Sequence, residues 1–201
     1  MSKPSDKLSK IAKSSRDDFY YFCKNILNYT KMSEDPHREL CDHITQDNGK
    51  RKWLTLMPRN SFKSSLVTIG HSIYSLVKNP DERILIASAT QKNARKYVNE
   101  IKTHFEQNER FRAIFGDYVS TDNLWRYDEF IINKRKGVFR EPSIMASSLE
   151  KQILTGMHYT AIYLDDVVDR STTSTPEQIA KTLDFYRLLL SILDPNGKIY
   201  I

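Results

Sequence analysis

The stretch Met57-Pro-Arg-Asn-Ser-Phe-Lys-Ser-Ser65 joins two apolar segments of this chain of 201 residues. The segment before it, Trp53 to Met57, is a short apolar run of the kind that forms a buried parallel strand. The segment after it, Ser64 to Val77, carries apolar residues at roughly helical spacing. The stretch is therefore predicted to be a turn between a strand and the N-terminus of a helix.

A turn in this position is suited to binding phosphate, because the first N–H groups of a helix lack partners and the helix dipole is positive there. The Lys63 side chain would reach the β- and γ-phosphates of a nucleotide, and the Ser64 hydroxyl would be a ligand of Mg²⁺. Met57 and Phe62 occupy the two glycine positions of the P-loop pattern G-x-x-x-x-G-K-[ST], and neither takes up left-handed backbone angles cheaply. Taken alone, Lys63 could equally be a solvated lysine on an ordinary helix.

A second segment supplies the acidic groups that such a site needs. Ala161 to Leu164 is a short apolar strand, and it delivers two carboxylates to its C-terminal end, where ligands bind in open α/β sheets. Asp165 would hold the water shell of Mg²⁺, and Asp166 would polarise the attacking water, although many NTPases have Glu there. The alternative is a solvated Asp-Asp turn. The two segments together predict a nucleoside triphosphate site.

Length and composition are typical of one globular α/β unit, with 39% hydrophobic and 28% charged residues. The longest uncharged stretch, Ser64 to Val77, is too short and too rich in Ser and Thr to span a bilayer, and no apolar signal core is present at the N-terminus. We therefore expect a soluble, cytoplasmic protein. Cys23 and Cys41 lack zinc-ligand spacing and are expected to be reduced thiols in or near the core.

The net charge of +6 favours a polyanionic partner, with nucleic acid as the first candidate. The alternative is that the basic residues are merely solvated, as a polar tail and a hairpin tip. They form two clusters: Lys3, Lys7, Lys10, Lys13 and Arg16 near the start, and Lys134, Arg135, Lys136 and Arg140 around Gly137.

Hydrophobic periodicity predicts alternating helices and strands, and hence a parallel sheet with right-handed crossovers. We expect an N-terminal basic tail and helical or lid region over residues 1–50, with residues 1–15 mobile, and an NTPase core over 51–201. The predicted helices are Arg16 to Tyr29, Pro36 to Asn48, Ser64 to Val77, a helix with Ala94 to Phe105 on one face, a short one with Phe111 to Phe115, and Pro176 to Leu193. The further predicted strands are Arg83–Ser88, Ser143–Ala146, Ala161–Leu164, Lys198–Ile201, and a hairpin of Glu129–Ile132 with Val138–Phe139.

Several segments together resemble the ATPase domain of the large terminase subunit of tailed bacteriophages, over residues from about 16 to the end. That resemblance implies a P-loop NTPase with a mainly parallel central sheet flanked by helices and a small N-terminal helical or lid region. The segments are Pro36-His-Arg-Glu-Leu-Cys-Asp42, Pro58-Arg-x-x-x-Lys-Ser-Ser65, Ser88-Ala-Thr90 with Ala94, Thr155-Gly-x-His158 leading into Tyr-Leu-Asp-Asp166, and Asp184-Phe-Tyr-Arg187.

The resemblance also implies a function. Large terminases are DNA-packaging motors: an N-terminal ATPase hydrolyses ATP with Mg²⁺ and pumps double-stranded DNA through a portal protein into a procapsid, and a C-terminal nuclease cuts the DNA. The implied partners are double-stranded DNA, the portal protein, the small terminase subunit and the nuclease domain of the full-length chain. We expect a monomer in solution, a ring only on the procapsid, no membrane, and a location in the cytoplasm of the bacterial host.

The resemblance assigns roles to particular residues. The family tolerates lost glycines in this turn and often carries an arginine there, so Arg59 would sense or stabilise the γ-phosphate and act in catalysis with Asp166. Ser64 and Asp165 would hold Mg²⁺. The nucleotide-binding residues would be Pro58, Arg59, Asn60, Ser61, Phe62, Lys63, Ser64 and Ser65.

Two further groups follow from the resemblance. The segment around Pro36 and His37 corresponds to the region that packs on adenine. An arginine finger, often supplied by a neighbouring subunit, is also implied, because positive charge aimed at the transferring phosphoryl group raises the rate by several powers of ten. The candidates are Arg126, Arg140 and Arg170, and the sequence does not choose between them.

The chain ends at Ile201, before the positions of the family's coupling motif and nuclease cluster. We therefore expect it to bind nucleotide better than it hydrolyses it, and to lack endonuclease activity. Two other classes of function stay open. One is a helicase-like nucleic-acid translocase, which would normally show Asp-Glu in place of Asp165-Asp166. The other is a nucleotide-binding or DNA-binding module without turnover.

Overall fold

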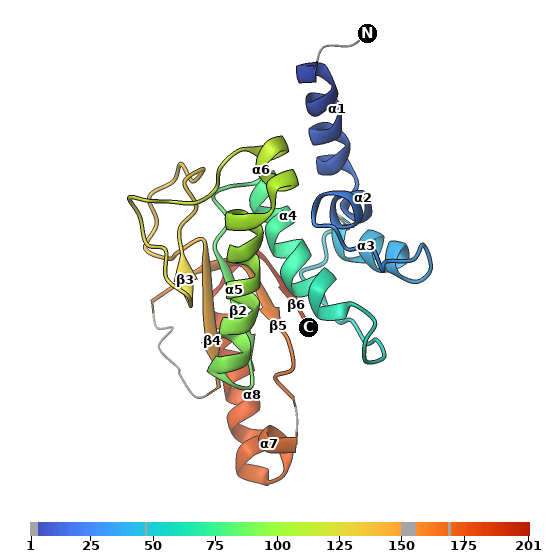
Figure 1. Ribbon diagram of the computed structural model, residues 1–201. Coiled ribbons are helices and arrows are strands. Elements are labelled where there is room, and N and C mark those ends of the chain that lie inside the picture. The colour runs from blue at the N-terminus through green and yellow to red at the C-terminus, as the bar shows by residue number, and fades with distance from the viewer. Residues whose placement is uncertain (1–3, 47, 150–155, 169) are drawn as a thin grey trace.

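The fold is built on a six-stranded sheet in the order β1-β6-β5-β2-β4-β3 (Figure 1). The computed structural model describes residues 4–46, 48–149, 156–168 and 170–201. All neighbouring strands are parallel except β3, which is antiparallel to β4. This confirms the predicted α/β class with a mainly parallel sheet. The strands are β1 (Lys52–Trp53), β2 (Ile84–Ser88), β3 (Glu129–Phe130), β4 (Ile144–Ser148), β5 (Tyr159–Leu164) and β6 (Leu193–Tyr200).

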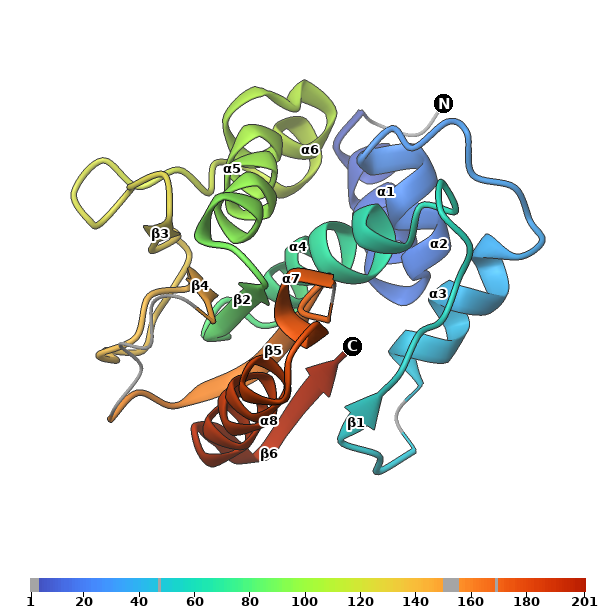
Figure 2. The same cartoon turned by 90° about the horizontal axis from the view of Figure 1, so that it is seen from below.

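Helices cover both faces of the sheet. Figure 2 shows α4 and α5 on one side and α8 on the other. Within the described part of the chain, no helix is long and apolar enough to cross a membrane. The helical segments are α1 (Pro4–Asp17), α2 (Phe19–Tyr21), η1 (Phe22–Ile26), α3 (His37–Thr45), η2 (Ser64–Gly70), α4 (His71–Lys78), α5 (Gln91–Gln107), α6 (Glu109–Phe115), α7 (Arg170–Thr173) and α8 (Pro176–Ser191); η1 and η2 are π-helical.

Strand β2 lies in the middle of the sheet and contributes to a core on each face. Ile84 and Ile86 join the core beneath α4 and α5, whereas Leu85 and Ala87 join the core beneath α8. All four are fully buried, and burial of each larger side chain is worth about 1.5–3 kcal/mol. A strand covered on both faces has no polar side, which is why its sequence is a continuous apolar run.

The N-terminal segment differs from its prediction. Residues 1–15 were expected to be mobile, but Pro4–Asp17 forms α1; Lys3 lies outside the described residues. Ala12 and Ser15 are buried, and the Arg16 guanidinium lies 5.2 Å from the centre of the Phe115 ring. The Tyr74 hydroxyl donates a hydrogen bond to the Arg16 carbonyl. Packing of one face of the helix therefore outweighs the polar composition of the segment.

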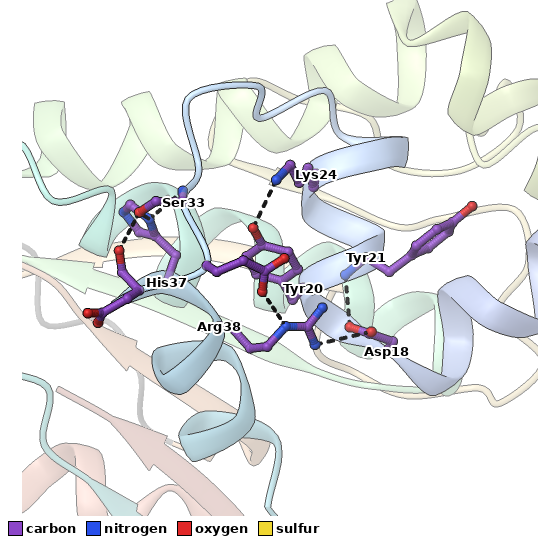
Figure 3. A network of polar contacts seen from close by, with 9 residues as sticks. Asp18, Tyr20, Tyr21, Lys24, Ser33, His37 and Arg38 are labelled. Carbon is purple, nitrogen blue, oxygen red and sulfur yellow. Dashed lines mark hydrogen bonds and ion pairs between the residues drawn. The ribbon is translucent and has the colours of Figure 1, made fainter.

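The helix predicted from Arg16 to Tyr29 is interrupted at Asp18. Asp18 has an extended backbone, and its carboxylate accepts a hydrogen bond from Tyr21 N at 2.8 Å, so that it caps a new helix. Arg38 on α3 pairs with Asp18 at 3.3 Å and lies 4.3 Å from the centre of the Tyr20 ring (Figure 3). This network fixes α3 against α2. Cys23 and Cys41 are buried free thiols, as predicted.

The predicted hairpin of Glu129–Ile132 with Val138–Phe139 is wrong. Strand β3 pairs instead with β4, with Glu129 opposite Met145 and Phe130 opposite Ile144. Val138 is fully exposed, and the Phe139 ring contacts the guanidinium groups of Arg83 and Arg135 and belongs to no strand. The apolar pair Val138-Phe139 therefore gave a false strand signal.

Strand β1 was predicted to be buried but lies at the edge of the sheet. Its pairing with β6 continues beyond its last residue, since Ile201 N donates to Trp53 O at 2.8 Å and Thr55 N donates to Ile201 O at 2.7 Å. Only one face is covered: Trp53 and Thr55 are buried, whereas Leu54 and Leu56 are 60% and 84% exposed.

The buried His71 should make the fold less stable in mild acid. Its Nδ1 atom lies 2.8 Å from the Tyr163 hydroxyl, and burial, followed by the charges of Lys198 and Lys78, lowers the pKa of His71 to about 3. The unfolded chain therefore binds a proton near pH 6.5 that the folded chain does not, and stability falls as the pH drops below that value. Between pH 7.5 and 5 we expect His71 alone to account for about 2 kcal/mol.

Urea unfolding across this pH range tests the prediction. His104, whose pKa burial lowers to about 4, acts in the same direction, so a His71→Phe variant should lose part of the slope and keep the rest. Phenylalanine suits the aromatic surroundings, which include Phe19 at 5.4 Å and Tyr200 at 4.8 Å between ring centres. An unchanged slope in the variant would contradict this role of His71.

Candidate nucleotide-binding site

The turn of residues 57–65 lies at the carboxyl end of β1 and runs into η2, as predicted. It forms most of the wall of a cavity of about 1120 Å³. A cavity of this size admits a nucleotide-sized ligand. The lining residues are Met57, Pro58, Arg59, Asn60, Ser61, Phe62, Lys63, Ser64, Ser65, Asn93, Asp166 and Val168.

Lys63 and Asp165, which are far apart in the sequence, meet in this structure. Lys63 Nζ lies 3.2 Å from Asp165 Oδ1, and the side chain of Asp165 is only 2% exposed. The Thr68 hydroxyl donates a hydrogen bond to Asp165 Oδ2 at 2.9 Å. Asp165 Oδ1 makes no hydrogen bond within the described residues, so the ion pair with Lys63 is its compensation for burial. The two segments singled out in the sequence therefore belong to one site.

Asp166 follows directly and is exposed to the cavity. The backbone holds it at the end of the sheet, because Asp165 N donates to Ala87 O at 3.0 Å and Ala89 N donates to Asp166 O at 3.3 Å. Its backbone angle φ is 51°, in the left-handed region. Aspartate tolerates this region better than most residues. Its carboxylate is thus available to act on a ligand, while that of Asp165 is buried.

Left-handed backbone is concentrated at this cavity. The non-glycine residues with positive φ in the described part of the chain are Asn28, Asn60, Phe62 and Asp166, and all but Asn28 line the cavity. Such strained positions cluster at functional sites. Phe62, at the second glycine position of the P-loop pattern, has a φ of 59°. Contacts between aromatic rings offset the strain of this backbone angle. The centre of the Phe62 ring lies 5.6 Å from that of His37 and 6.3 Å from that of Tyr29.

We expect Phe62→Gly to be more stable than Phe62→Ala by about 1 kcal/mol. Both variants lose the ring contacts equally, but only glycine adopts a left-handed angle without strain. Urea unfolding of the two variants measures the difference. The same pair of substitutions at Ser61, which lacks a positive φ, is the control and should show no advantage for glycine. An alanine variant at position 62 as stable as the glycine variant would contradict the strain.

The segment around Pro36 and His37 reaches the turn through Phe62. Ser33 N donates a hydrogen bond to His37 Nδ1 at 3.0 Å, and the two side chains lie together in Figure 3. His37 Nδ1 is therefore the acceptor, and the proton of the neutral ring lies on Nε2. The imidazole meets the Phe62 ring edge to face. The N-terminal helical region thus borders the turn.

The oxygen atoms available at this site suit a metal ion that is bound partly by the protein and partly by a phosphate ligand. No cluster of three or more His, Cys, Asp or Glu side chains that could hold a metal occurs among the described residues. Mg²⁺ is commonly bound by one or two protein groups together with phosphate oxygens and water, and Asp165 Oδ1, buried without a hydrogen bond, fits that arrangement beside Ser64.

Tyr97 on α5 is a site residue that the sequence did not identify. Burial, followed by the negative charge of Asp165, raises the pKa of Tyr97 to about 12, and the neighbouring Ser64 side chain acts in the opposite direction. The phenol therefore stays protonated beside the predicted Mg²⁺ ligands. In the sequence Tyr97 was one of several residues on the apolar face of a helix, and no signal distinguished it.

The candidate arginines differ in position. Arg59 is exposed and lines the cavity. Arg126 pairs with Glu129 at 3.4 Å at the β3 edge of the sheet, opposite the β1 edge, and Arg140 donates to Gly156 O at 3.2 Å. Neither lines the cavity. The side chain of Arg170 lies outside the described residues, as does Thr155 of the motif before β5.

Comparison with known proteins adds no assignment. No protein-family model matches the chain, and no curated protein matches its sequence. The function is therefore inferred from the turn, from Lys63 and from the paired aspartates.

Proposed function

We propose that this chain binds ATP with Mg²⁺ and hydrolyses it, as the ATPase domain of a viral DNA-packaging motor, the terminase large subunit. The observation that carries the proposal is the 3.2 Å contact between Lys63 Nζ and the buried Asp165 at a large cavity. An ordinary solvated lysine would not be held against a buried carboxylate. A cation and an anion at one helix N-terminus are what a magnesium–triphosphate complex requires.

Each residue has a role in the proposed reaction. The N–H groups at the start of η2 and the Lys63 ammonium would bind the phosphates, and Lys63 would exchange Asp165 for a phosphate oxygen when the nucleotide enters. Asp165 and Ser64 would hold Mg²⁺, which would supply positive charge to neutralise the charge that develops on the phosphates. Asp166 orients a water molecule and accepts its proton as the oxygen attacks the γ-phosphorus and ADP leaves. Arg59 stabilises the charge on the γ-phosphoryl group.

The partners follow from the resemblance to large terminases. Double-stranded DNA would be the translocated polymer, and the portal protein, the small terminase subunit and a nuclease domain of the same full-length chain would be protein partners. The motor would be a homo-oligomeric ring on the procapsid in the cytoplasm of a bacterial host. An arginine finger from a neighbouring subunit would complete the site.

Calorimetric titration of the purified chain with ATP and Mg²⁺ tests the proposal directly. We expect saturable binding at one site that weakens when Mg²⁺ is removed with a chelator, and weak or undetectable binding of AMP, which lacks the β- and γ-phosphates. Phosphate release with and without double-stranded DNA then measures turnover. Equal affinity for ATP and AMP would argue against a site organised around Lys63.

A further inference from the structure

Residues 133–140, within the segment that joins β3 to β4, form an exposed basic loop. It contains Lys134, Arg135, Lys136 and Arg140 and no acidic residue. Lys134, Lys136 and Arg140 are exposed, and Val138 is fully exposed. Like charges repel one another, so these neighbouring cations disfavour the folded loop unless negative charge lies nearby.

The basic loop has a defined shape despite its exposure. Asp81 Oδ1 accepts hydrogen bonds from Lys136 N and Gly137 N, both at 2.8 Å, and these bonds lower the pKa of Asp81. The Phe139 ring has the Arg83 guanidinium 4.6 Å from its centre and the Arg135 guanidinium at 4.8 Å. The loop is therefore anchored along its middle, and its lysines are presented on a fixed framework.

The guanidinium groups on this framework are only partly paired: Arg83 Nη2 forms an ion pair with Asp194, and Arg135 Nη1 donates a hydrogen bond to the Glu141 carbonyl at 2.7 Å. The buried Nε atom of Arg83 and the buried Nε and Nη2 atoms of Arg135 have no hydrogen-bond acceptor among the described residues. Burial, followed by the charge of Arg83, lowers the pKa of Arg135. Asp81 accepts hydrogen bonds from backbone amides and Glu141 Oε1 accepts one from His158 N at 2.7 Å, and the charges of both carboxylates raise the pKa of Arg135 in turn. The exposed side chains of Lys134, Lys136 and Arg140 are the cations of the loop that an external anion can reach.

We propose that the basic loop, residues 133–140, contacts the phosphate backbone of duplex DNA. Exposed lysines and an exposed arginine on a fixed backbone suit a regular array of phosphates, which they bind by charge and without reading sequence. An anionic membrane fits less well, because membrane-surface binding needs a larger apolar face than the exposed side chains of Val138 and Phe139 provide. The choice of DNA as the polyanion rests on the proposed packaging function.

The position of the basic loop separates it from the nucleotide. Strands β3 and β4 are antiparallel, so the loop joins them at the amino end of β4, and β4 is parallel to β2 and β5. The turn with Lys63 and the Asp165-Asp166 pair lie at the carboxyl ends. Figure 1 shows the β3–β4 segment and α7 at opposite ends of the sheet. DNA and nucleotide would therefore bind without competing for one surface.

Fluorescence anisotropy of a short labelled DNA duplex over a series of salt concentrations tests the inference. In Lys134→Gln/Lys136→Gln we expect DNA affinity to fall about tenfold, and the slope of log Kobs against log salt to shrink by about 1.8, because each phosphate contact contributes about 0.9. Lys134→Glu/Lys136→Glu should lose more. The matched control is Lys7→Gln/Lys10→Gln on α1, which removes the same charge from the other basic cluster and should have a small effect.

Three results would overturn the inference. The loop variant could bind DNA as tightly as the wild type does, or the α1 control could lose as much DNA affinity as the loop variant. The loop variant could also lose binding to anionic phospholipid vesicles while it keeps its binding to DNA. Titration with ATP and Mg²⁺ keeps the two proposals apart, because both lysines lie away from the nucleotide-binding cavity. If the loop variant binds both ATP and DNA as the wild type does, the loop is not the DNA-binding site, and the ATPase proposal is unaffected. If the wild type binds DNA through the loop but binds no ATP, the ATPase proposal is wrong and DNA binding by the loop stands.

Discussion

Lys63→Ala should weaken binding of ATP with Mg²⁺ by about 10- to 150-fold, which corresponds to the loss of one charge-assisted hydrogen bond worth about 1.5–3 kcal/mol. The side chain is 28% exposed and paired with Asp165 at 3.2 Å, so it can turn to a phosphate without crossing the core. Calorimetric titration measures the loss. The matched control is Lys181→Ala, because that lysine is exposed on α8 and lines no part of the cavity.

The same substitution should also lower the free energy of unfolding, because Asp165 would stay buried without its cation. A double variant, Lys63→Ala/Asp165→Asn, removes both charges and should recover part of that stability while nucleotide binding stays weak. Lys63→Arg keeps the charge and should be as stable as the wild type. If Lys63→Ala left ATP affinity unchanged, the lysine would be structural and the proposed function would be wrong.

Asp166→Asn should leave nucleotide binding near the wild-type level and reduce hydrolysis by about 10²- to 10⁴-fold, the usual contribution of a general base. The substitution is well matched to the backbone, because asparagine tolerates the left-handed conformation that Asp166 adopts with a φ of 51°. A loss of activity can therefore be attributed to the carboxylate rather than to misfolding. The measurement is steady-state phosphate release at saturating ATP.

Two further variants make the Asp166 result specific. Asp184→Asn removes an exposed carboxylate on α8 and should not change the rate, because that residue does not line the cavity. Asp165→Asn removes the buried carboxylate and should abolish the dependence of ATP affinity on Mg²⁺, which Asp166→Asn should preserve. Hydrolysis by Asp166→Asn at the wild-type rate would assign water activation to another group.

Much of the fold could be predicted because several segments carry strong local signals. The run Ile84–Ser88 is uniformly apolar and is a central strand. Pro176 was expected to open a helix, and α8 begins there, after Thr175 caps Gln178 N at 3.3 Å. In such segments the local preference and the tertiary environment agree, so pattern alone locates the element.

The wrong predictions have a common cause in long-range packing. The hairpin was inferred from Val138 and Phe139, but β3 gains more by pairing with the buried β4. The basic start of the chain was expected to be mobile, but α1 packs where Tyr74 and Phe115 offer partners from distant segments. Tyr97 was assigned only to a helix face, because its neighbour Ser64 comes from another element.

By itself, the sequence determined the α/β class, the order of most elements, and the two segments that carry Lys63 and Asp165, since apolar periodicity and the chemistry of single residues are local properties. Only the tertiary structure decided that Lys63 Nζ and Asp165 Oδ1 lie 3.2 Å apart, that Phe62 adopts a left-handed backbone, and that β1 forms an edge. Contacts between distant segments depend on how the strands are ordered in the sheet, and that order follows from the packing of the whole chain rather than from any one segment.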